Sequence, residues 1–180
     1  MKKLAALLVA VFVSASAIAQ TDSIGVYAIR NTSLDRIDVL TYQQTKISGG
    51  VIKGKAKLAF AGATSQNRFS GSARFRLYFG TPSPYDVAKY YMFTPAYSVK
   101  DFSVGKFEVK KGVRYLTTAT ISIAGSTIGA SEAKDVEVNS IKLCDNVYEI
   151  TVTGPAGEYC IMPVLNGVAG YAGVFDFTIE

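Results

Sequence analysis

The chain of 180 residues contains no histidine. Histidine is the side chain that most readily exchanges protons near neutral pH, and it is the commonest ligand of metal ions in proteins. Its absence excludes Ser-His and Cys-His nucleophile pairs as well as histidine metal sites. Most hydrolase and zinc-site mechanisms are therefore ruled out, and we expect no catalytic residue, no metal and no cofactor.

Tryptophan is also absent, and cysteine is rare. Without tryptophan the largest aromatic stacking surface is missing, although 11 Tyr and 10 Phe could partly replace it. Cys144 and Cys160 could pair in an oxidising compartment, where a bridge closing about 15 residues could contribute roughly 3 kcal/mol. Two buried apolar thiols are the alternative. Both stay open, because the sequence does not give the distance between the two Cα atoms.

Long apolar runs are missing beyond the first residues of the chain. Lys2 and Lys3 are followed by an apolar run over residues 4–13 and by residues 14–19, which end in the small-x-small step Ala17-Ile18-Ala19. This pattern predicts a signal peptide over residues 1–19, cleaved between Ala19 and Gln20. The run is too short for a spanning helix, which needs about 20 apolar residues.

The signal peptide predicts an exported protein that is periplasmic, on the outer surface or secreted. We expect no transmembrane segment after cleavage. Residues 20–180 have the length of a single domain that can bury a core of its own.

The charge of the chain is mildly positive. Its formal value of +5 falls to +3 when Lys2 and Lys3 are removed, and no basic run is longer than Lys110-Lys111. A nucleic-acid-binding surface normally needs a denser basic cluster. We therefore expect no nucleic acid as partner, but an unknown protein or glycan of the cell envelope.

Short apolar runs separated by Gly, Pro, Asn and Ser predict an all-β fold. About ten strands are expected, a number that suits a β-sandwich. Alternation along residues 72–79 predicts a sheet with one solvent-exposed face. Lys110-Lys111-Gly112 predicts a hairpin with Gly112 at positive φ, and residues 126–134 are expected to form an exposed loop. The strands are expected over residues 23–30, 36–42, 55–61, 72–79, 102–109, 114–123, 136–143, 147–152, 158–164 and 174–179.

One short helical flap is expected to interrupt these strands. Ser83 suits a helix N-cap, Pro84 the first helical position and Asp86 the third. The helix is expected to run from residue 84 to about residue 92 and to pack on the edge of the sandwich. Aromatic side chains in and after it form the binding candidate, with simple packing as the alternative. They are Tyr85, Tyr90, Tyr91, Phe93 and Tyr97.

Two further patterns bear on chemistry. Residues 49–55 match most of a phosphate-binding P-loop, but Ala56 stands where the motif needs a hydroxyl, so we expect a loop before a strand. Carboxylate pairs could in principle hydrolyse a glycoside without histidine, with solvated surface charge as the alternative. The candidates are Asp35 with Asp38, Asp86 with Asp101, and Glu132 with Asp135 and Glu137.

Gly157-Glu158-Tyr159 enters an expected strand and resembles the tyrosine corner of immunoglobulin-like sandwiches, in which the phenol bonds to the crossing loop. Cys160 directly follows Tyr159 and must point to the opposite face, so the inter-sheet disulfide of antibody domains does not carry over. Together with residues 73–80, 84–91 and 175–177, this step resembles a loose group of uncharacterised exported bacterial β-sandwich proteins. The resemblance implies an immunoglobulin-like C-terminal part and transfers no catalytic residue.

These observations favour an exported noncatalytic β-sandwich protein that is a binding or structural component of the cell envelope. Two alternatives stay open. One is a carbohydrate-binding module that uses the tyrosine-rich flap. The other is a carboxylate-based glycoside hydrolase.

Overall fold

The computed structural model describes residues 24–50, 53–79, 99–122, 125–128, 133–163 and 173–180. This part of the chain is all-β, with three sheets and a single 3-10 turn, η1 (Val99–Asp101). The predicted signal peptide (1–19) and helical flap (84–92) lie outside the described residues. No helix in the described ranges is long and apolar enough to span a membrane.

Two of the sheets face each other across the main core. In the first, five strands lie in the order β11 (Glu137–Cys144), β12 (Val147–Thr153), β6 (Ser72–Tyr78), β1 (Gly25–Arg30) and β2 (Ser33–Arg36). In the second, the order is β5 (Arg68–Phe69), β14 (Phe175–Ile179), β13 (Gly157–Pro163) and β7 (Phe102–Lys106). Along β6, Ala73, Phe75 and Leu77 are buried while Arg74 is exposed, which confirms the predicted solvent-exposed face.

Aromatic rings fill the centre of this core. Phe177 on β14 packs edge-on against Phe75 at 4.9 Å between centroids and stacks on Tyr159 at 5.7 Å. The Tyr159 phenol donates a hydrogen bond to the backbone oxygen of Pro155 at 2.7 Å. The hydrogen bond expected of a tyrosine corner is therefore present, and it ties the turn between β12 and β13 to the core.

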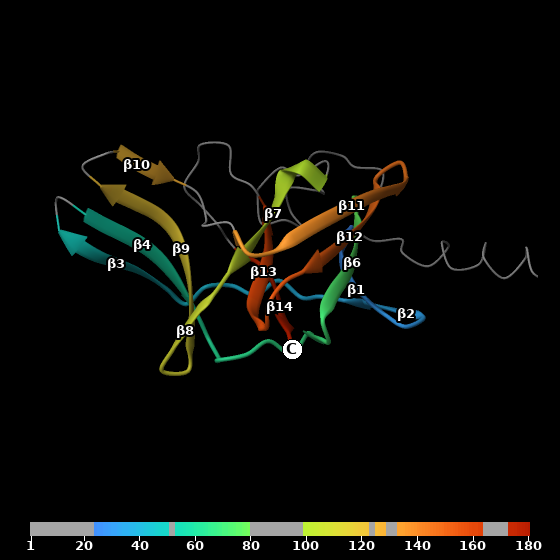
Figure 1. Cartoon of the computed structure of the whole chain (residues 1–180), viewed down its shortest axis with the longest axis horizontal. Coiled ribbons are helices and arrows are strands. Elements are labelled where there is room, and N and C mark those ends of the chain that lie inside the picture. The colour runs from blue at the N-terminus through green and yellow to red at the C-terminus, as the bar shows by residue number, and fades with distance from the viewer. Residues whose placement is uncertain (1–23, 51–52, 80–98, 123–124, 129–132, 164–172) are drawn as a thin grey trace, which may run out of the picture.

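The third sheet, which we call the wing, extends to one side of the facing sheets (Figure 1). Its strands are β10 (Gly125–Ile128), β9 (Val113–Ser122), β4 (Lys53–Phe60) and β3 (Gln44–Gly50), and β8 (Glu108–Lys110) also pairs with β9. The base of the wing packs on the second sheet, on the face opposite the main core. The residues of this second core are Leu58, Phe60, Phe107, Leu116, Cys160, Met162 and Val174.

The second sheet is thus the middle layer of the molecule. All five residues of β14 are buried. Phe175, Phe177 and Ile179 belong to the main core, and on the other face of the strand Asp176 pairs with Arg114 of the wing. Tyr159 and Cys160 point into different cores, as their adjacency on β13 predicted.

The two cysteines are free in the structure, so the disulfide considered for Cys144 and Cys160 is not formed. Cys144 is exposed at the end of β11 in the first sheet. Cys160 is fully buried and faces the wing, so the second sheet separates its thiol from the first sheet. Burial away from water strongly raises the pKa of Cys160 and leaves an unreactive apolar thiol.

Several predicted elements were wrong. The strand predicted over residues 36–42 is not formed. The chain turns earlier, at Asn31, which has a φ of 51°, so β2 pairs directly back on β1 and ends at Arg36. Leu40 makes only an isolated bridge with Val174. The loop expected over 126–134 begins as β10, which pairs with β9, and β3 and β5 were not predicted. The described residues thus form fourteen strands, more than the expected ten or so.

Residues at positive φ define two of the turns between strands. Lys111 and Gly112 have φ values of 50° and 76°, which confirms the predicted hairpin. The P-loop-like residues form a different hairpin, with Gly49 opposite Gly54. Gly49 has a φ of 108°, and a Cβ there would lie 2.1 Å from the backbone oxygen of Lys53. The glycine therefore serves strand pairing, and a strand follows it in place of the helix that binds phosphate in a P-loop.

Candidate functional site

The described residues form two notable hollows, of which the first is apolar. It has a volume of about 290 Å³ and lies between the edges of the facing sheets, at β7 and β11. Val99 and Ala133 also belong to its wall. Ser103 is its only polar lining residue among those described, and the hollow therefore offers little to orient a ligand.

The second hollow is a groove of about 420 Å³ on one face of the wing. We call it the lysine groove. It is lined by Lys46, Ser48, Lys57, Lys110, Lys111 and Tyr115.

Strand register gathers these side chains. Lys46 on β3 lies opposite Lys57 on β4, and Ser48 lies opposite Lys55. Because side chains alternate between faces with a period of two, Lys53 and Lys55 share the face of Lys57. The β8–β9 hairpin then brings its own lysines to the rim of the same groove.

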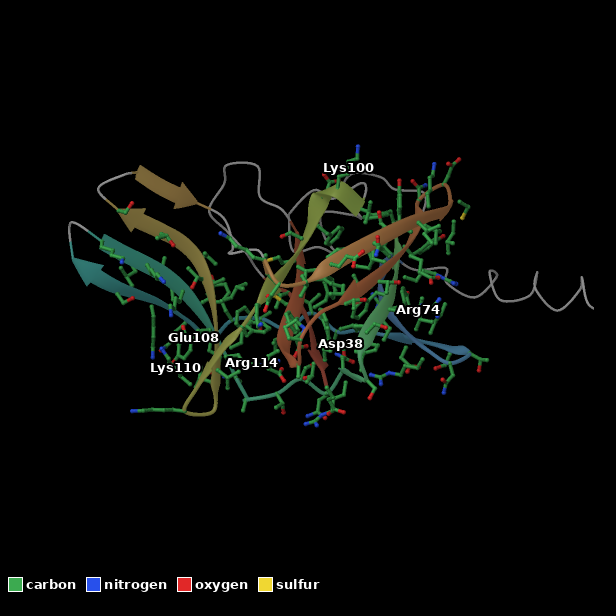
Figure 2. The ribbon with its side chains drawn as sticks, in the orientation of Figure 1. Asp38, Arg74, Lys100, Glu108, Lys110 and Arg114 are labelled. Atoms are coloured by element: carbon green, nitrogen blue, oxygen red, sulfur yellow. The ribbon has the colours of Figure 1, made fainter. Side chains whose placement is uncertain are left out.

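Two contacts organise the groove. The ammonium of Lys46 donates a hydrogen bond to the Tyr115 hydroxyl at 2.9 Å. Glu108 forms ion pairs with both Lys57 and Lys110 and lies beside Lys110 on the wing (Figure 2). Hydrogen bonds from Lys110 and Lys57 lower the pKa of Glu108 from 4.5 to about 2. The carboxylate is therefore ionised throughout the neutral range and cannot serve as a general acid there.

Positive charge is in excess on this face. Six lysines stand against one carboxylate: four line the groove, and Lys53 and Lys55 continue along β4. Among the described residues no carboxylate lies within ion-pair distance of Lys53, Lys55 or Lys111. A concave surface of one charge sign concentrates ions of the opposite sign. The groove is thus suited to an anionic ligand.

A second charged cluster is buried at the base of the wing. Arg114 on β9 is 3% exposed, and its Nη1 lies 2.6 Å from Oδ2 of Asp176 and 3.4 Å from Oε2 of Glu158. Glu158 also accepts hydrogen bonds from the Ser65 backbone and the Thr178 hydroxyl. Among the described residues Nε of Arg114 has no hydrogen-bond partner, but both of its terminal nitrogens and the two carboxylates are paired away from solvent. We therefore assign the cluster to anchoring the wing on the second sheet.

Most of the site residues predicted from sequence either lie outside the described part or form ion pairs. The whole aromatic group, Tyr85, Tyr90, Tyr91, Phe93 and Tyr97, lies outside it. Asp35 pairs with Arg30 at 3.2 Å, and Asp135 pairs with Lys106. That lysine lowers the pKa of Asp135, whereas the general acid of a glycosidase needs a raised pKa.

Asp86 and Glu132, the remaining partners in two of the carboxylate pairs, lie outside the described residues. Within the described ranges no three acidic or cysteine side chains cluster as metal ligands would.

The lysine groove was missed because its residues are scattered along the sequence, whereas strand pairing places them on one face. A usable signal was nevertheless present. No Asp or Glu occurs between Asp38 and Asp86, and Lys53, Lys55 and Lys57 alternate within that acid-free stretch. On a strand, such alternation predicts a positively charged face.

Replacing Glu108 by Gln is expected to lower stability at pH 7 by less than about 1 kcal/mol, because the carboxylate is partly exposed. With a folded pKa of about 2 and an ordinary value of 4.5, the contribution of Glu108 is complete above pH 4.5 and is lost as the pH falls toward 2. Urea denaturation at pH 7, 4 and 2.5 should show the gap between wild type and Glu108→Gln closing. A gap that widened on acidification would contradict the ion pairs described.

The chemistry of the groove is the basis for its functional assignment. Comparison of the chain with protein-family models, with curated proteins and with solved structures gave no match.

Proposed function

We propose that the protein is an exported, noncatalytic binding protein of the cell envelope, and that the lysine groove binds an anionic ligand. The excess of six lysines over one carboxylate on one face of the wing carries this proposal. Export is supported by the N-terminal sequence pattern, which is typical of a signal peptide.

The proposal includes an immunoglobulin-like β-sandwich for the two facing sheets. Their shared core and the hydrogen bond from Tyr159 to Pro155 support it. In this arrangement the sandwich is the rigid support, and the wing carries the binding surface away from it. This arrangement is compatible with a periplasmic, an outer-surface or a secreted location.

Binding of dextran sulfate, compared with uncharged dextran, tests the groove. The two polymers share a backbone and differ in charge. We expect isothermal titration calorimetry at low salt to detect binding of dextran sulfate but not of dextran. The affinity should fall as salt is added, because exposed charges are screened.

A pair of double variants separates local charge from net charge. Lys53→Glu/Lys55→Glu is expected to weaken binding of dextran sulfate roughly tenfold or more, since two unpaired lysines are reversed. Lys100→Glu/Lys134→Glu makes the same change in net charge outside the groove and should have a much smaller effect; Lys100 lies well away from the wing (Figure 2). Equal losses in both variants, or no binding by wild type, would overturn the proposal.

The carbohydrate-binding module that uses Tyr85, Tyr90, Tyr91, Phe93 and Tyr97 is kept as the alternative proposal. Phenol rings stack on neutral sugars and do not require charge. Binding of a neutral glycan that is lost in Tyr90→Ala/Tyr91→Ala and retained in Lys53→Glu/Lys55→Glu would favour this module over the groove.

A further inference from the structure

Resting on the proposed function, we infer that the anionic partner is the surface of a phospholipid bilayer. The outer end of the wing contacts this surface, with its lysines among the headgroups and Ile47 entering the boundary between headgroups and acyl chains. Two features of the wing point to a membrane and not to a soluble polyanion.

The first feature is the exposure of Ile47. This side chain is 84% exposed, the highest value among the exposed large apolar residues of the described part. It lies on β3, close to the hairpin that Gly49 and Gly54 close, and pairs across the strands with the small residue Ala56. An apolar side chain held in water near the end of a projecting sheet gains free energy when it enters an apolar phase.

The second feature is the arrangement of charge around it. Lys46 precedes Ile47 in β3, and Lys53 and Lys55 lie on the paired strand without carboxylate partners among the described residues. Each lysine close to an anionic membrane adds roughly fivefold to partitioning. Stable attachment of a protein to a bilayer usually needs such charge together with an apolar contact.

A soluble polyanion and a bilayer would contact different faces of the wing. Ile47 follows Lys46 in the strand, so the two side chains point to opposite faces of the sheet. A soluble polyanion lying in the groove touches the lysine face alone. A bilayer approached by the outer end of the wing, which extends away from the sandwich (Figure 1), meets both faces.

Vesicle flotation tests the inference with the full exported chain. We expect binding to vesicles of phosphatidylglycerol and phosphatidylcholine, and none to vesicles of phosphatidylcholine alone. Ile47→Ser should lower partitioning by about fivefold or more while leaving dextran sulfate binding unchanged. Ile141→Ser, at another exposed isoleucine on β11, is the matched control and should behave as wild type.

The outcomes separate the inference from the proposed function. Dextran sulfate binding without vesicle binding would overturn the membrane inference and leave the groove intact. If neither dextran sulfate nor vesicles bind, the membrane inference and the proposed function are both overturned. Vesicle binding that Ile47→Ser leaves unchanged would overturn the apolar contact, and vesicle binding that survives Lys53→Glu/Lys55→Glu would overturn the role of the lysines. All the substituted side chains are exposed, so we expect every variant to fold. Circular dichroism melting of each variant verifies this.

Discussion

Replacing Arg114 by Met is expected to lower the free energy of unfolding by about 3–5 kcal/mol. Methionine is of similar length but leaves Asp176 and Glu158 buried without their cation. It also removes the hydrogen bond from Nη2 of Arg114 to the Ala61 backbone oxygen, 3.1 Å long. Uncompensated buried charge is among the most destabilising changes a single substitution can make.

Urea denaturation at pH 7 measures this loss. Arg68→Met is the matched control, because Arg68 pairs with Glu180 at the surface and should cost less than about 1 kcal/mol. If Arg114→Met yields no folded protein, Asp176→Asn provides a milder change, since the amide keeps an oxygen that can accept from Arg114. A loss for Arg114→Met no larger than that for Arg68→Met would show that the buried cluster does not hold the wing.

Local patterns predicted much of the fold. The alternation in β6, the Lys110–Gly112 turn and the opposed faces of Tyr159 and Cys160 depend on residues close in sequence, and the structure confirms them. The strand expected over 36–42 was wrong for a related reason. Its apolar residues are present, but the tight turn at Asn31 moves the pairing to β2, and Ile37 is buried without belonging to a strand.

Local reasoning could have predicted the positively charged face of β4, but not the groove that β3 and β9 complete. Lys46 and Tyr115 are 69 positions apart in the chain and meet only because β3, β4 and β9 are neighbours in one sheet. Neighbouring strands can come from distant parts of the sequence, and their order is not encoded in any one segment. Basic runs counted along the chain therefore underestimated the charge that one face of the wing carries.

Truncating Phe177 to Ala is expected to cost about 3–5 kcal/mol, comparable to the loss of Arg114. Phe177 is fully buried and has ring contacts with Phe69, Phe75 and Tyr159. Removing the ring leaves a cavity between the two facing sheets and also deprives Tyr159 of the surface on which it stacks. Backbone pairing in β14 is unaffected by the truncation, so the cost comes from lost packing.

Thermal and urea denaturation of Phe177→Ala and Phe177→Leu measure this cost. Leucine fills part of the cavity and should recover a good part of the stability, whereas Ile141→Ala, at an exposed position, should change it by no more than about 0.5 kcal/mol. Phe177 adjoins Asp176 on β14, yet the two side chains face different layers. If Phe177→Ala costs no more than Ile141→Ala, the two facing sheets cannot share the core described.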